Sequence, residues 1–192
     1  MKISRWVLAC GIALFFAGMA VAQDEAPKAE VFAGYSYVRV NPGFGAPGIN
    51  FNGGSASVSY NPNSWLGLVA DFGGYHGSEF GVSADVYSYL FGPKLALRKG
   101  AFTPYAQTLF GGAHGSAGAG CPVFAARLHR EGGIICGSGS DNAFAMTIGG
   151  GLDWNATEHI GIRLVQAEYF MTRFLSETQN NARISTGVVF RW

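Results

Sequence analysis

The chain has 192 residues, of which 29 are glycine, 13% are charged, and the formal net charge is +1. The charged share is about half, and the glycine share about twice, what a soluble domain usually carries. A chain this close to neutral offers no polycationic surface, so we expect no nucleic-acid partner.

The first 22 residues have the organisation of a cleaved secretory signal peptide. Residues 1–5 are a short basic start, residues 6–19 are an apolar run, and residues 20–22 form an A-x-A cleavage site. Residues 23–29 follow as a short lead, and we expect one domain over residues 30–192. No later stretch approaches the 18 uncharged apolar residues that a spanning helix needs.

Eight segments of the mature chain alternate between apolar residues and small or polar ones, which is typical of β-strands. In the last segment, ARISTGVVFRW, Ile184, Val188 and Phe190 share one face, while Arg183 and Arg191 lie on the other. The predicted strands are residues 30–40, 53–60, 65–75, 85–97, 102–115, 143–154, 160–174 and 182–192.

Short and long connections alternate between these strands. The tight turns are NPNS, RKG and NATEH, and the long connections are residues 41–48, 76–84, 116–142 and 175–181. This is the pattern of an outer-membrane barrel, in which periplasmic turns are tight and extracellular loops are longer. The sequence therefore predicts an all-β, eight-stranded, antiparallel, transmembrane up-and-down barrel. A lipocalin-like secreted barrel would carry its apolar residues inward, the inverse of the serine and glycine faces seen here.

Aromatic residues gather beside the predicted periplasmic turns and at the C-terminus. Rings at one height of a barrel form an interfacial girdle where the bilayer meets water. The predicted girdle consists of Tyr60, Trp65, Phe102, Trp154 and Trp192.

Polar residues on the faces opposite the apolar ones predict a charged barrel interior. In the seventh strand, Arg163 has the opposite parity to Gln166 and Glu168, and we favour a β-bulge that brings all three inside. An eight-stranded interior is about filled by side chains, so paired groups are favoured over an ion path opened by exchange of partners. The predicted interior groups are Asp71, Lys94, Asp153, Arg163, Gln166, Glu168, Arg183 and Arg191.

Cys121 and Cys136 lie in the longest connection and are the two cysteines left after signal cleavage. Because exported proteins meet an oxidising compartment, we expect a disulfide between them. The pinned loop either presents a binding surface or is merely stabilised, and both alternatives stay open. Its cysteine and histidine spacing does not predict a zinc site.

The pattern His-x-Ser occurs twice, as His76/Ser78 and His114/Ser116. Residues two apart share a strand face, so a histidine could activate the neighbouring serine. This arrangement resembles the outer-membrane lipid A deacylases, which are eight-stranded barrels. The sequence offers no convincing acidic residue to orient either histidine, so we favour chance placement.

Four segments together resemble the small bacterial outer-membrane barrels related to the OmpA transmembrane domain. They are the opening VFAGYSYVR, then FGPKLAL, GGGLDW, and the terminal VVFRW. The resemblance implies an eight-stranded barrel, and it implies that Val188, Phe190 and Trp192 form the signal read by the barrel-assembly machinery. Because the chain ends at Trp192, we expect no peptidoglycan-binding domain after the barrel. Relatives include anchors, adhesins, small pores and enzymes, so the family does not name a function.

These observations together predict a non-enzymatic protein in the outer membrane of a Gram-negative-type bacterium, exported by a cleaved signal peptide. Its expected role is structural or a surface interaction through extracellular loops. The alternatives are a small porin-like channel and, ranked below it, a lipid A-modifying hydrolase. Expected partners are outer-membrane lipid, the assembly machinery and an extracellular ligand. We expect no catalytic residue, metal or cofactor.

Overall fold

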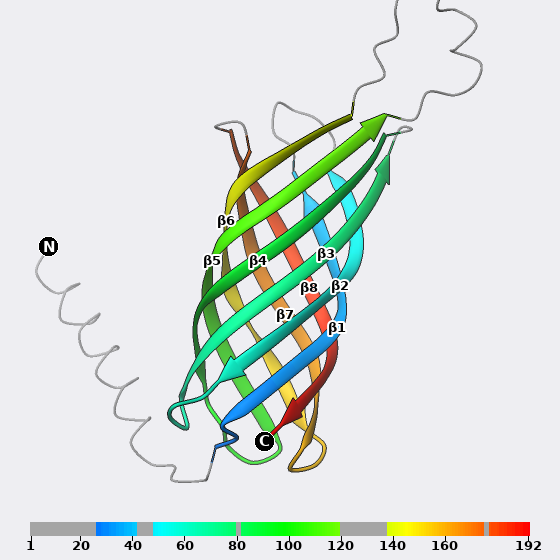
Figure 1. Cartoon of the computed structure of the whole chain (residues 1–192). Helices are drawn as coiled ribbons and strands as arrows, with labels where there is room; N and C mark the ends of the chain where they lie inside the picture. Colours follow the sequence, from blue (N-terminus) through cyan, green and yellow to red (C-terminus); the bar gives the residue numbers. More distant parts are fainter. Residues whose placement is uncertain (1–25, 42–47, 80–81, 120–137, 175–176) are drawn as a thin grey trace, which may run out of the picture.

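The protein forms a closed barrel of eight antiparallel strands (Figure 1). The computed structural model describes residues 26–41, 48–79, 82–119, 138–174 and 177–192. Each strand pairs with its neighbours in chain order, and β1 pairs with β8 to close the ring. The strands are β1 (Ala29–Val40), β2 (Ile49–Tyr60), β3 (Leu66–Glu79), β4 (Val82–Ala96), β5 (Phe102–Ala119), β6 (Ser138–Asn155), β7 (Ile160–Phe174) and β8 (Glu177–Arg191). The predicted eight-stranded up-and-down barrel is confirmed.

The barrel has two distinct ends. The connections after β2, β4 and β6 are short and lie at the same end as the C-terminus, which we name the turn end (Figure 1). Trp192 exchanges two backbone hydrogen bonds with Ala29 there, at 3.0 and 3.1 Å. The opposite end, where β1, β3, β5 and β7 finish, is named the loop end.

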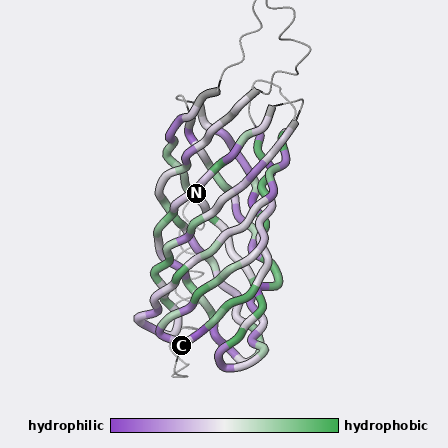
Figure 2. The backbone as a smooth tube through the Cα atoms, turned by 45° about the vertical axis from the view of Figure 1, so that its right-hand side comes forward, coloured by the Kyte–Doolittle hydropathy of each residue, from purple (hydrophilic) through white to green (hydrophobic). Residues whose placement is uncertain are grey.

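In the middle of the barrel the outward side chains are mainly apolar, and toward the turn end the inward side chains are mainly polar. Hydrophobic and hydrophilic positions alternate along the strands (Figure 2). On the outer surface Leu68, Phe91 and Ile148 are 55%, 50% and 51% exposed, whereas the inward Asp71 and Arg183 are 2% and 0% exposed. This is the inverse of a lipocalin-like barrel and is the arrangement of a barrel with lipid outside. No helix among the described residues has the length and apolar character needed to cross a membrane.

Glycines allow tyrosine rings to lie flat against the barrel wall. A Cβ added at Gly112 would lie 2.4 Å from the Tyr89 hydroxyl on the outer surface, and one at Gly151 would lie 2.6 Å from the Tyr105 hydroxyl inside. Only a residue without a side chain leaves this space, and such aromatic cover protects a glycine in a strand.

The bulge predicted in the seventh strand is present. The register between β6 and β7 shifts after Leu152, and the register between β7 and β8 shifts between Arg163 and Gln166. Leu164 and Val165 both face outward, at 45% and 43% exposed, so Arg163 and Gln166 both face inward. The extra residue thus removes the parity conflict in the sequence.

Six strands run further at the loop end than the sequence predicted. Residues 76–79 and 82–84 continue β3 and β4, and residues 116–119 and 138–142 continue β5 and β6, although we had assigned them to loops. Likewise β2 begins at Ile49 and β8 at Glu177. In β3, β5, β6 and β8 the prediction was wrong because the backbone ladder continues without apolar side chains, so no alternation marks it. In β2 the added residues Ile49 to Asn52 do alternate, and the prediction began the strand too late. Since about 9–11 residues span a bilayer, the 18-residue β5 and β6 extend well beyond one.

Candidate functional site

Glu30, at the start of β1, holds three cations at the turn end of the interior. Its carboxylate accepts hydrogen bonds from Nζ of Lys94 and, at 3.2 Å, from Nη2 of Arg98. Nε of Arg191 lies 3.5 Å from the same carboxylate. Glu30 and Lys94 are 3% and 2% exposed. Removing one partner of such a buried pair would leave an uncompensated charge.

Asp153 forms the second centre of this turn-end cluster. Arg163 donates from Nε to Oδ1 of Asp153 at 2.9 Å and from Nη2 to Oδ2 at 3.3 Å, and Nη2 of Arg191 lies 3.4 Å from Oδ2. The Arg163 guanidinium also lies 4.2 Å from the centre of the Phe32 ring and 4.7 Å from that of Tyr105. These cation–π contacts hold the guanidinium across the barrel axis.

Amide side chains connect this cluster to the next layer. Oε1 of Gln166 accepts hydrogen bonds from Nη1 of Arg163 at 2.6 Å and from the Tyr105 hydroxyl at 2.8 Å. One layer further toward the loop end, Nε2 of Gln107 donates to Oε1 of Glu168 at 2.8 Å. Both glutamines therefore use their amides inside the barrel rather than in solvent.

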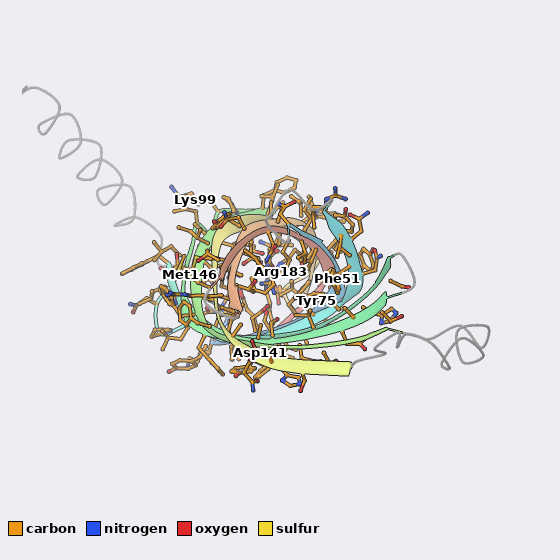
Figure 3. The ribbon with its side chains drawn as sticks, turned by 90° about the horizontal axis from the view of Figure 1, so that it is seen from above. Phe51, Tyr75, Lys99, Asp141, Met146 and Arg183 are labelled. Atoms are coloured by element: carbon orange, nitrogen blue, oxygen red, sulfur yellow. The ribbon has the colours of Figure 1, made fainter. Side chains whose placement is uncertain are left out.

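A second cluster lies nearer the loop end, and we name it the upper cluster. Arg183 is its centre and is fully buried between two carboxylates. It donates from Nε to Oε2 of Glu168 at 2.6 Å and from Nη1 to Oδ1 of Asp71 at 2.7 Å. Nη1 also donates to the Tyr75 hydroxyl at 2.9 Å. Seen from above, Arg183 and Tyr75 lie within the ring of strands (Figure 3).

The eight groups predicted to lie inside are all buried, and each joins one of these contacts. The sequence analysis missed Glu30, Arg98, Tyr75, Tyr105 and Gln107. The alternation along β5 could have placed Tyr105 and Gln107 inside the barrel, because they lie on the same buried face as Thr103 and Leu109. Nothing local signals the Arg98–Glu30 pair, because 68 residues separate its members.

The five predicted girdle aromatics all lie at the turn end, on or beside the outer surface. In the strand pairing, Tyr60 lies opposite Ala29 and Phe102 lies opposite Trp154. The backbone carbonyl of Trp65 accepts a hydrogen bond from the backbone N–H of Ala96. The outer surface carries further aromatic residues nearer the loop end, which were not predicted from the sequence and which we name the second aromatic level. It consists of Tyr35, Tyr87, Phe144 and Tyr169, which are 44–57% exposed.

Polar pairs join neighbouring strands just beyond the second aromatic level. Tyr37 donates to Oδ1 of Asn50 at 2.7 Å, and Nδ1 of His114 lies 3.0 Å from Oδ1 of Asn142. Nδ1 of His76 lies 2.7 Å from Oδ1 of Asp85, on the adjacent strand β4. His76 therefore has the acidic partner that the sequence analysis did not find.

The remaining predicted positions can be placed only in part. Val188, Phe190 and Trp192 face outward and are 39%, 41% and 64% exposed. Cys121 and Cys136 lie outside the described residues, as does the signal peptide, so the disulfide and the cleavage site stay predictions. Within the described ranges, no group of three or more His, Cys, Asp or Glu side chains could hold a metal ion.

Solved structures similar to this chain are eight-stranded barrels of the bacterial outer membrane. The attachment invasion locus protein Ail of Yersinia pestis matches with a TM-score of 0.58 and 19% identity, over 86% of this chain and 99% of Ail. Neisserial surface protein A matches with a TM-score of 0.62 and 12% identity, over 88% of this chain and all of that chain. The chain has the fold of a small outer-membrane β-barrel.

A third outer-membrane barrel, the N-terminal domain of Pseudomonas aeruginosa OprF, matches with a TM-score of 0.51 and 14% identity, over 86% of this chain and 100% of that one. One structure of Ail is a complex with the heparin analogue sucrose octasulfate. No protein-family model matches the chain, and no curated protein matches it. At these identities the likeness to other outer-membrane barrels concerns the fold.

Proposed function

We propose that the protein is a non-enzymatic barrel of the bacterial outer membrane whose loop end faces outward and contacts an extracellular ligand. The chain would be exported by a signal peptide cleaved after Ala22. The barrel-assembly machinery would read Val188, Phe190 and Trp192. The Cys121–Cys136 disulfide would constrain the longest connection on the extracellular side.

The observation that carries this proposal is the combination of an interior closed by ion pairs below its loop end with strands that project from the loop end. Contacts run from Glu30 at the turn end to Asp71 in the upper cluster, so side chains occupy the path an ion would take. An eight-stranded barrel is narrow enough for its own side chains to close it at these layers. The projecting ends of β3 to β6, in contrast, form a paired sheet beyond the apolar band. Figure 1 shows β5 and β6 reaching furthest at the loop end.

Two measurements separate this proposal from the small-pore alternative. In planar lipid bilayers, the folded chain is expected to show no discrete conductance steps, because the buried ion pairs close the interior. In lipid nanodiscs, it is expected to be retained on immobilised matrix proteins. Heparin, whose analogue is bound in one structure of Ail, serves as the polyanion comparison, on which this chain is expected to be retained weakly because it has no polycationic surface. Discrete conductance would overturn the proposal in favour of the pore.

The retention measurement has a matched control. Ser116→Glu with Ser140→Glu adds negative charge to the outward face of the projecting sheet, where the two residues pair. This variant is expected to lose retention, because the two added carboxylates would have to be desolvated at the contact, whereas Thr178→Glu on the exposed face of β8 is expected to keep it. Equal retention in both variants would place the contact away from the sheet.

One observation favours a second candidate, a lipid hydrolase. The 2.7 Å contact between His76 Nδ1 and Asp85 Oδ1 orients the imidazole as a triad carboxylate does, and Ser78 follows on the same outward face. Ser78 Oγ would attack an ester carbonyl while His76 takes its proton and passes it to the leaving alcohol. Water would then release the acyl group from Ser78. The site lies above the second aromatic level, where lipid head groups would be.

Fatty-acid release from vesicles that contain lipid A tests this second candidate. If the chain hydrolyses lipid A, Ser78→Ala and His76→Ala are each expected to lower the rate about 100-fold or more. Ser83→Ala is the control, because Ser83 is the exposed serine directly across from Ser78 on β4. Unchanged release in Ser78→Ala would exclude this site.

A further inference from the structure

The loop-end part of the barrel interior is apolar, unlike the charged layers beneath it. Val38, Phe51 and Phe170 are 1–4% exposed and belong to a buried hydrophobic cluster with Leu90 and Leu109. Figure 3 shows Phe51 and Tyr75 inside the ring of strands, near Arg183. The neighbouring Arg183 cluster therefore forms a polar floor beneath an apolar chamber.

This chamber contains a cavity of about 200 Å³ between β1, β2, β3, β4, β7 and β8. Its wall is mainly apolar and includes Val38, Phe51, Val86 and Phe170. Val86 is half-buried, as are the cavity residues at the strand ends, so the cavity reaches the loop end of the barrel. A smaller apolar cavity of about 150 Å³ stays dry and binds benzene, so this one has the size for a single six-membered ring with a small substituent.

Apart from the hydroxyl of Tyr75, which accepts a hydrogen bond from Arg183, the polar groups that line the cavity gather at one side, on β7 and β8. Nδ2 of Asn181 donates to Oγ1 of Thr172 at 3.2 Å, and Oγ1 of Thr172 donates to Oε1 of Gln179 at 3.3 Å. All three residues line the cavity. An occupant can therefore place one hydrogen-bonding group against this corner while its ring contacts the apolar wall.

We infer that the loop end of the barrel interior binds a small neutral aromatic molecule with one hydroxyl group, of the phenol class. Charge is excluded from the occupant because the described residues of the wall include no counter-ion and an unpaired charge against apolar side chains is costly. The polar floor of the chamber provides no counter-ion either, because Arg183 is already paired with Asp71 and Glu168. The site is independent of the proposed surface contact, because it lies inside the barrel rather than on the projecting sheet.

Fluorine NMR of 4-fluorophenol with the full chain in lipid nanodiscs tests this inference. Saturable binding is expected, about tenfold tighter than that of fluorobenzene, since the hydroxyl gains a hydrogen bond at the polar corner. Gln179→Leu is expected to reduce the preference for the phenol. Val86→Phe fills the cavity and is expected to abolish saturable binding, while Val58→Phe makes the same change on the lipid face, where Val58 is 51% exposed, and keeps it.

Each variant is first checked for heat-modifiable gel migration, so that loss of binding is read only from folded barrels. Absence of saturable binding in the folded wild type would overturn the inference. Equal binding in Val86→Phe and wild type would also overturn it, because the probe would then be elsewhere. Binding seen only after deletion of residues 122–135 would show that the chain itself fills the cavity, which contradicts the inference as well.

Discussion

Replacement of Arg183 by methionine is expected to lower the free energy of unfolding by about 3–5 kcal/mol. Arg183 is fully buried and is the cation shared by Asp71 and Glu168, at 2.7 and 2.6 Å. Without it, two carboxylates remain inside the barrel without this counter-ion. Urea unfolding from lipid vesicles, followed by tryptophan fluorescence, measures the change.

The triple variant Arg183→Met, Asp71→Asn, Glu168→Gln is the control for this prediction. Replacing a whole buried ion-pair group by neutral residues of similar size is often close to neutral. The triple variant is therefore expected to recover most of the stability that the single variant loses. A single variant within about 1 kcal/mol of wild type, the range of a surface pair, would show that water reaches this cluster.

Arginine in the middle of the outer apolar band is expected to be the other strongly destabilising change. Ile148 is 51% exposed on the outer face of β6, between Trp154 at the turn end and Phe144 at the second aromatic level. If lipid surrounds this level, Ile148→Arg lowers the free energy of unfolding by about 2–4 kcal/mol. The same urea titration in lipid vesicles measures it.

Ser140→Arg is the matched control, because Ser140 lies on the same face of the same strand but beyond the second aromatic level. Its expected cost is about 0–1 kcal/mol, the value near an interface. Similar small costs at both positions would mean that water, and not lipid, surrounds Ile148.

The sequence was most informative where the outer face meets lipid. In β8, Ile184, Val188 and Phe190 alternate with inward Arg183 and Arg191, and the structure shows that alternation. The bulge in β7 could be predicted because a parity conflict among charged residues has few solutions in a barrel that excludes charge from its outer surface.

Two features could not be read from the pattern. Beyond the apolar band, the ends of β3 to β6 are rich in Gly, Ser and Ala, which do not distinguish strand from loop although the backbone ladder continues. The interior also changes character along the barrel. Phe51 lies outside the predicted second strand and Phe170 near the end of the seventh, so the cavity between them became visible only once register and closure placed both strands.

The contact between Glu30 and Arg98 could not be predicted from the sequence either. Arg98 belongs to a predicted turn, and Glu30 opens the first strand. The two side chains meet across the interior at the turn end, although β1 and β4 are not adjacent strands of the closed ring. A pair of this kind depends on strand tilt and barrel closure, which no local pattern encodes.

Migration of the unheated and boiled protein in detergent gels, using protein from an isolated outer-membrane fraction, tests the membrane barrel most directly. A closed barrel held by the β1–β8 pairing and the buried ion pairs is expected to run compactly in cold detergent and to shift after boiling. A protein that shows no shift and fractionates with soluble periplasmic proteins would contradict the membrane-spanning barrel.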